Sequence, residues 1–136
     1  MTNEQRLIEI LKYLKREGEN TSPPDKLGLS PSQVNIIDHV FLAKKLTVKE
    51  LSQNLKLKPP TVSVSVKKLE QISILKRKSH EEDGRVVLLM LTKKGFNTYN
   101  QIEKYRTDRV KTILNRLNST EQNQMLTLLE KALKDD

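Results

Sequence analysis

Cysteine is absent from this chain of 136 residues. Without a thiol, the chain cannot form disulfides, thiolate metal sites, covalent thiol intermediates or a cysteine-based redox sensor. Long apolar runs are missing as well. None approaches the roughly twenty residues of a membrane helix, and the polar start MTNEQR lacks the apolar body of a secretion signal. We therefore expect a cytoplasmic protein with no membrane partner.

Cofactor and catalytic motifs are also missing. No GxxxxGK[ST] or GxGxxG string marks a phosphate-binding loop. The two histidines, His39 and His80, have no partner at i+3 or i+4, and no nucleophile stands beside a base. The acidic run at residues 81–83 is more typical of a solvated turn than of a cation site. We expect no cofactor, no metal and no enzymatic activity.

Positive charge, in contrast, is gathered in one place. Residues 44–79 hold ten Lys and Arg against two acids, Glu50 and Glu70, so this segment alone carries the +8 net charge of the chain. Lys and Arg that neutralise phosphates release condensed counterions, so such a segment indicates a polyanion partner. Charge alone does not distinguish DNA from RNA or a membrane surface.

Apolar residues at helical spacing predict three amphipathic helices in the first half of the chain. The first is expected over residues 6–17. Two capping boxes, S-x-x-Q from Ser30 and T-x-x-E from Thr47, predict two further helix starts. The apolar stripes are expected to consist of Leu7, Ile10, Leu11 and Leu14, then Val34, Ile37, Val40 and Phe41, then Val48, Leu51 and Leu55.

A fourth helix is predicted over residues 59–72, with two prolines tolerated in its first turn. Val62, Val66 and Leu69 form its apolar stripe. At about 100° per residue, the opposite side carries small, polar and cationic side chains, and we expect that side to be open to a ligand. Its members are Pro60, Thr61, Val64, Lys67, Lys68 and Gln71.

The next segments predict a β-hairpin: an alternating stretch at residues 75–79, an acidic turn at 80–85 and an aliphatic run at 86–91. A long helix is predicted over 92–117, and S-T-E-Q from Ser119 is expected to cap a last helix. Two helices with a tight turn, followed by a hairpin, make a winged helix-turn-helix, whose second helix enters the major groove of DNA. The expected fold class is mainly α with a small β-hairpin wing.

Helices remain at both ends of this module. Hydrophobic residues make up 35% of the chain, which is thin for a monomer that must bury its own core. We therefore expect the terminal helices to pair with those of a second copy in a homodimer. The single domain 1–136 would comprise a winged helix-turn-helix core at 30–92 and N- and C-terminal dimerisation helices at 1–18 and 93–136.

The segment LEQISILKRKSHEEDGRVVLLMLTKKG, residues 69–95, resembles the wing of the MarR (multiple antibiotic resistance regulator) family, including its D-x-R at 83–85. Upstream, LTVKELSQNLKLKPPTVSVSVKKLE is similar to the helix-turn-helix of that family, and the outer helices are similar to its dimerisation arms. The acidic wing tip is also similar to that of the related staphylococcal accessory regulators. In two departures, Val64 stands where many members carry arginine, and Ser73 replaces the common glycine before the wing.

The resemblance implies a homodimeric transcription regulator, usually a repressor, that binds a pseudo-palindromic operator in double-stranded DNA. In many members a small anionic or aromatic ligand releases the DNA. It also implies that Arg85 enters the minor groove and that Asp83 orients a nearby arginine. The full set of expected DNA-binding residues is Thr61, Ser63, Val64, Lys67, Lys68, Gln71, Arg77, Asp83 and Arg85. Tyr13 and Phe41 are candidate ligand contacts, because their helices would flank a crevice.

Simpler interpretations exist for each feature. Lys67 and Lys68 could merely solvate a helix, and Arg85 could be a loop arginine paired with an acid. Residues 76–78 alternate along a strand, so only some can contact phosphate. An alternative function is a winged-helix protein-interaction module that docks an acidic partner, and an RNA-binding winged helix is a third. Steep salt dependence together with strong sequence preference would favour the DNA-binding regulator alone.

Overall fold

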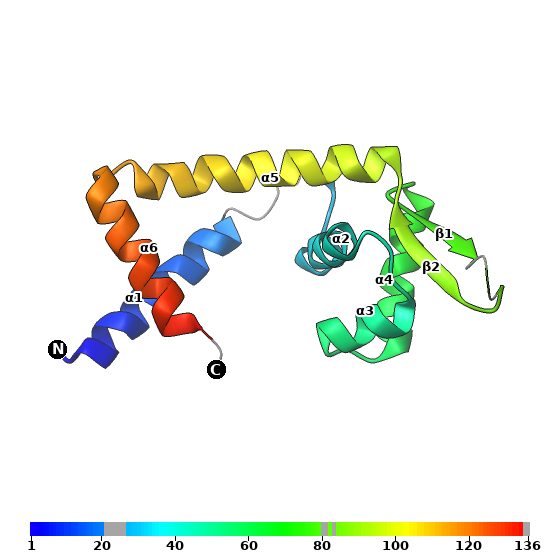
Figure 1. Cartoon of the computed structure of the whole chain (residues 1–136), viewed down its shortest axis with the longest axis horizontal. Helices are drawn as coiled ribbons and strands as arrows, with labels where there is room; N and C mark the ends of the chain where they lie inside the picture. Colours follow the sequence, from blue (N-terminus) through cyan, green and yellow to red (C-terminus); the bar gives the residue numbers. More distant parts are fainter. Residues whose placement is uncertain (21–26, 80–81, 83, 135–136) are drawn as a thin grey trace. The chain divides into compact units, whose positions relative to one another are not determined.

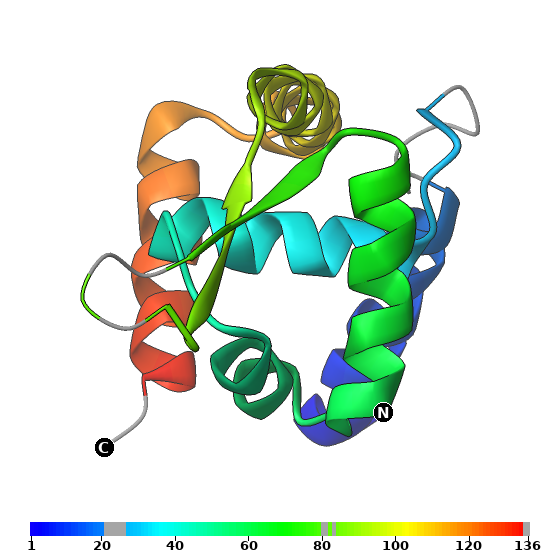
Figure 2. The same ribbon diagram turned by 90° about the vertical axis from the view of Figure 1, so that its right-hand side faces the viewer.

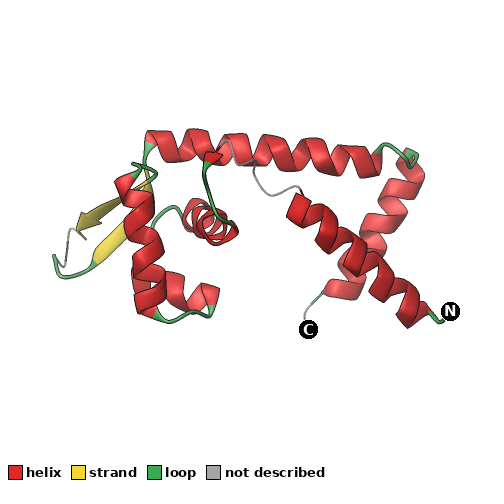
Figure 3. Ribbon diagram, turned by 180° about the vertical axis from the view of Figure 1, so that it is seen from behind, coloured by secondary structure: helices red, strands yellow, loops and turns green. Residues whose placement is uncertain are grey.

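The computed structural model describes the whole chain except residues 21–26, 80–81, 83 and 135–136. His80 and Asp83 therefore lie outside the described residues. The described part divides into two compact units, Met1–Glu103 and Lys104–Asp136. Its elements are α1 (Asn3–Asn20), α2 (Pro31–Ala43), α3 (Val48–Leu55), α4 (Pro59–Gln71), β1 (Leu75–Ser79), β2 (Val87–Leu91), α5 (Lys93–Leu114) and α6 (Ser119–Leu133) (Figure 1). Helices dominate and the two strands form one hairpin, so the predicted fold class is confirmed (Figure 3).

Local capping explains where several helices begin. The Ser30 hydroxyl accepts from the Gln33 amide while the Gln33 side chain accepts from the Ser30 amide, so the predicted capping box starts α2. Thr47 and Glu50 form the same reciprocal pair at α3, again as predicted. The prediction for α6 was wrong by one residue. Asn118, not Ser119, is the N-cap, and its side chain accepts from the Glu121 amide.

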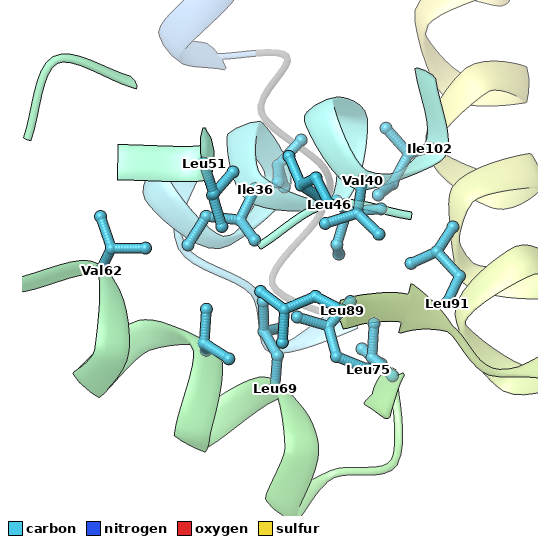
Figure 4. Packing of buried hydrophobic residues seen from close by; sticks show 14 residues of the cluster. Ile36, Val40, Leu46, Leu51, Val62, Leu69, Leu75, Leu89, Leu91 and Ile102 are labelled. Atoms are coloured by element: carbon cyan, nitrogen blue, oxygen red, sulfur yellow. The ribbon is translucent and has the colours of Figure 1, made fainter. Parts of the chain in front are cut away.

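The core of the first unit lies between α2, α3, α4, the hairpin and the start of α5 (Figure 4). The stripe of α4 is buried as predicted, and so are Val34, Ile37 and Val40 of α2. Phe41 lies at the margin and stays 36% exposed, whereas Ile36, outside the predicted stripe, is buried. Among the described residues, fourteen apolar ones are buried: Val34, Ile36, Ile37, Val40, Leu46, Leu51, Val62, Val66, Leu69, Ile74, Leu75, Leu89, Leu91 and Ile102.

The hairpin packs against this core through one face. β1 and β2 are antiparallel, with Leu75 opposite Leu91 and Arg77 opposite Leu89. β2 also contacts α2 and α3, while β1 contacts α4, and Figure 2 shows the hairpin in front of α2 with α4 and α3 beside it. Leu46 forms a single-residue antiparallel bridge with β2: its amide donates to the Leu89 carbonyl, and the Leu89 amide donates to the Leu46 carbonyl. This bridge attaches the middle of β2 to the turn between α2 and α3.

A dense set of hydrogen bonds joins the end of α4 to the start of α5. The Thr92 amide donates to the Ile74 carbonyl at 3.0 Å, and the Thr92 hydroxyl donates to the Ser73 carbonyl and accepts from the Gly95 amide. The Lys94 ammonium donates to the carbonyl of Ile72, the C-cap of α4, at 2.8 Å. A cation at this end also complements the helix dipole of α4. These contacts fix the base of the wing relative to the fourth helix.

Over its described residues, the second unit contains no buried side chain. All residues from 104 to 134 are described, and each is exposed or half-buried. Its turn is held by the Gln122 side-chain amide, which donates to the carbonyls of Leu114 and Leu117 at 2.9 and 3.1 Å. Residues 1–16, which include most of α1, are likewise all exposed. These helices therefore leave most of their apolar side chains exposed to solvent.

Replacing Gly95 with alanine should lower the free energy of unfolding by about 2–3 kcal/mol, within the usual cost of overpacking a core. A Cβ at this position would lie 2.3 Å from the Ile74 carbonyl oxygen and 3.2 Å from two side-chain carbons of Leu91. Urea denaturation followed by circular dichroism measures the change. Gly84→Ala is the matched control, because a Cβ there meets nothing within 4 Å. Equal free energies of unfolding for both variants would show that the packing around Gly95 can accommodate an added methyl group.

Candidate nucleic-acid interface

The fourth helix presents the predicted polar face to solvent. Because Val62, Val66 and Leu69 are fully packed into the core, the rotation of α4 about its axis is fixed. Val64 is 57% exposed and Ser63 is half-buried at the edge of the open face. The other expected contacts on this helix are also exposed: Thr61, Lys67, Lys68 and Gln71. The structure thus brings these six side chains onto one accessible side.

The N-terminus of α4 offers an anion little help from its backbone. Pro59 and Pro60 occupy the first two positions and have no N–H group. The next two amides, of Thr61 and Val62, both donate to the Lys58 carbonyl at 3.0 and 3.2 Å. Phosphate attraction at this end of the helix must therefore come from side chains, and Lys58, the N-cap residue, is exposed there.

All ten basic residues between 44 and 79 are exposed. Five of them lie before α4: Lys44 and Lys45 in the turn after α2, Lys49 on α3, and Lys56 and Lys58 in the turn before α4. The helix contributes Lys67 and Lys68, and β1 contributes Lys76, Arg77 and Lys78. The positive segment of the sequence is therefore a solvated surface of the helix-turn-helix and hairpin, available to a polyanion.

The strand residues of β1 do not share one environment. Arg77 lies opposite the buried Leu89, so its side chain starts on the face of the hairpin that packs on the core. Its guanidinium Nε donates to Glu70 Oε1 at 2.7 Å. Lys76 and Lys78 alternate with it and lie opposite Met90 and Leu88 on the other face. Glu70 is a residue that sequence reasoning missed, although its position as the lone acid of α4 was a visible signal.

The wing tip carries Arg85, which is exposed in the turn before β2. Asp83, the expected orienting acid, is outside the described residues. At the base of the wing, Ser73 adopts a positive φ of 63°, a left-handed conformation that glycine accepts more readily than serine. The departure from the common glycine therefore falls at a position where the backbone favours glycine.

The two candidate ligand contacts are in different surroundings. Phe41 stacks on Tyr99 with ring centroids 3.7 Å apart and an interplanar angle of 12°, and it meets Phe96 edge-on at 6.2 Å. Tyr13 is exposed on α1. The ring contacts found in the described part of the chain do not join Tyr13 to Phe41.

The described residues contain no group of three or more His, Asp or Glu side chains placed to hold a metal ion. None of the helices there is both long enough and apolar enough to span a membrane.

Comparison with known proteins identifies the family. The model of the family described as transcriptional regulator SarA/Rot matches residues 21–102, which include the whole helix-turn-helix and wing. The chain belongs to this SarA/Rot family. Its fold is that of the MarR-type winged-helix regulators, so the resemblance seen in the sequence is confirmed.

Individual relatives of this SarA/Rot chain support the same assignment. The organic hydroperoxide resistance transcriptional regulator of Bacillus subtilis is 33% identical over 97 residues, covering 70% of this chain and 66% of that protein. The curated relatives are matched over 58% to 66% of their own length. A mutant of MepR from S. aureus has a TM-score of 0.85 at 20% identity, covering 98% and 97% of the two chains. A second MepR mutant, bound to an oligodeoxyribonucleotide, has a TM-score of 0.72 at 21% identity, covering 98% and 96%.

Proposed function

We propose that this SarA/Rot-family regulator is a homodimeric, sequence-specific DNA-binding protein, most simply a repressor, that recognises a pseudo-palindromic operator. The observation that carries the proposal is the exposed face of α4. Lys67 and Lys68 share the exposed side of this helix with the small side chains of Thr61 and Val64, so the helix can approach base edges closely while cations reach the phosphates. The oligodeoxyribonucleotide bound to a MepR mutant of the same fold supports this interpretation.

Each part of the surface then has a distinct role. Thr61, Ser63, Gln71 and Lys67 would meet base edges in the major groove, and Val64 could contact only a thymine methyl group. The lysines of residues 44–58 and Lys68 would neutralise phosphates. Arg85 would enter the minor groove, with Asp83 orienting a neighbouring arginine. We also propose that a small anionic or aromatic ligand releases the DNA, with Tyr13 and Phe41 as its candidate contacts.

The homodimer is supported by the apolar side chains that one copy leaves uncovered. Helices that expose an apolar stripe in water gain stability when a second copy covers it. Such residues lie on α1, on the distal part of α5 and on α6. They are Leu7, Ile10, Leu11 and Leu14, then Val110 and Ile113, then Leu126, Leu129 and Leu133.

The proposed function predicts which DNA the purified protein selects. Fragments recovered from a genomic library should share a palindrome whose half-sites are about ten base pairs apart, because a two-fold dimer places its recognition helices roughly one DNA turn apart. Affinity for that palindrome should fall steeply with salt and exceed affinity for random DNA at least about a thousandfold. Tight binding to an acidic protein without a DNA preference would instead favour the protein-interaction module.

Arg85→Ala should weaken binding to the selected operator by about tenfold to a hundredfold, the usual scale for losing a specific contact in both half-sites. The urea midpoint should stay close to that of the wild type, since Arg85 is exposed. Fluorescence anisotropy at fixed salt measures the affinity. The control is Lys93→Ala, which removes an exposed cation at the start of α5. An equal loss of operator affinity in both variants would mean that Arg85 contributes only its positive charge and no specific contact.

Leu129→Lys should raise the dimer dissociation constant more than about a hundredfold, because a lysine buried without a partner costs on the order of 3–5 kcal/mol. Sedimentation equilibrium measures this constant directly. Thr127→Lys adds the same side chain to α6, about 200° away around the helix, and should leave the dimer intact. Unchanged assembly of Leu129→Lys would place the interface elsewhere.

A further inference from the structure

One ion pair connects α4, the proposed recognition helix, directly to the β-hairpin that forms the wing. The Arg77 Nε–H, in the middle of β1, donates to Glu70 Oε1, in the last turn of α4, at 2.7 Å. Their side chains are 42% and 25% exposed, so the pair is partly shielded from water. The ion pair between Lys12 and Glu9, in contrast, joins neighbouring turns of the same helix, α1. The Glu70–Arg77 pair links two different elements, α4 and β1.

The hairpin register explains why Arg77 meets α4. Residues opposite one another on antiparallel strands share a face, and Arg77 pairs with Leu89 two positions beyond the Leu75–Leu91 pair. Leu75, Leu89 and Leu91 are buried in the core. Arg77 continues this inward face beyond the apolar contacts, toward the end of α4. Lys76 and Lys78 belong to the opposite face and have no such partner among the described residues.

The charge of Glu70 makes its position informative. It is the only acidic residue of α4, on a helix whose exposed side carries Lys67 and Lys68. A carboxylate near a DNA phosphate backbone opposes binding through repulsion. An acid at the end of such a helix is therefore unfavourable for DNA affinity unless it contributes something else. Glu70 accepts a hydrogen bond from Arg77 of the wing strand, and this contact can offset the repulsion.

We propose that Glu70 and Arg77 are positioning residues that hold the wing at a fixed angle to the recognition helix, so that both reach their grooves together. This inference rests on the proposed function, and it gives Arg77 a role other than the phosphate contact expected from the sequence. The pair lies beyond Ser73, where the chain turns from α4 into β1, and so restrains the wing farther from its base than the Thr92 and Lys94 hydrogen bonds do. A wing held in place loses less conformational freedom when it binds.

The direction in which Glu70→Gln changes operator affinity tests the proposal. Glu70→Gln removes a negative charge near DNA, and if Arg77 were only a phosphate contact restrained by Glu70, operator binding would become tighter. If the pair positions the wing, binding should instead become about threefold to tenfold weaker, on the scale of partly exposed ion pairs counted once in each subunit. Hydroxyl-radical footprinting should show lost protection where the wing lies, with protection by α4 retained. The urea midpoint should hardly change.

A double-mutant cycle and a strand control complete the experiment. Arg77→Met should weaken binding to a similar degree, and the combined variant should lose little more, since both changes break one interaction. Lys78→Met, one residue along on the opposite face, should add independently to Glu70→Gln. The charge exchange, Glu70→Arg together with Arg77→Glu, should bind the operator more tightly than Glu70→Gln or Arg77→Met alone, because it restores an ion pair between α4 and β1.

The outcomes separate this inference from the function on which it rests. A wild-type protein without preference for any duplex would overturn both. A wild-type protein that selects an operator, together with a Glu70→Gln variant that binds it equally well or more tightly, would overturn the positioning role alone. Additive losses in the cycle would do the same, because they would mean that Arg77 contacts DNA independently of Glu70.

Discussion

Burial of a single apolar stripe on α4 determines which side of that helix faces outward. Val62, Val66 and Leu69 are packed against side chains from α2, α3 and the hairpin, and each is at most 1% exposed. Fully burying one such side chain contributes about 1.5–3 kcal/mol, so exposing all three would cost about 4.5–9 kcal/mol, which is comparable to the whole free energy of unfolding of many domains. The basic side is therefore held outward by the core itself, whether or not any ligand is present.

The wing depends on the same helix in a second way. Its base is formed by consecutive backbone carbonyls of residues 72–74, which accept from Lys94 and Thr92 at the start of α5. Gly95 allows this approach, because any larger residue would collide with the Ile74 carbonyl. Ser73 meets the same geometry at some conformational cost, since its φ of 63° lies in the left-handed region. Tight backbone packing thus compensates for a residue that does not favour the turn.

Sequence patterns were sufficient wherever the determining interactions are local. The capping boxes at Ser30 and Thr47 involve residues three apart, and the stripe of α4 repeats within one helix, so both were predictable. The start of α6 was misplaced by one residue, because N-x-x-E from Asn118 overlaps S-x-x-Q from Ser119 and both patterns satisfy the same rule. The contact between Glu70 and Arg77 was not predictable in this way. It depends on the turn at Ser73 and on the strand register, which tertiary packing sets.

Buried apolar side chains are distributed unevenly along the chain. In the part of the chain that the structure describes, the fourteen buried apolar residues all lie between residues 34 and 102, whereas none occurs in residues 1–16 or 104–134. α5 takes part in both regions, since Gly95, Thr98 and Ile102 are buried while Val110 and Ile113 are exposed. If two copies pair through the exposed stripes, the core of each copy sets which bases its α4 can meet. The spacing between the two half-sites is then set by contacts that a single copy does not contain. Base preference and half-site spacing would therefore respond to substitutions in separate parts of this sequence.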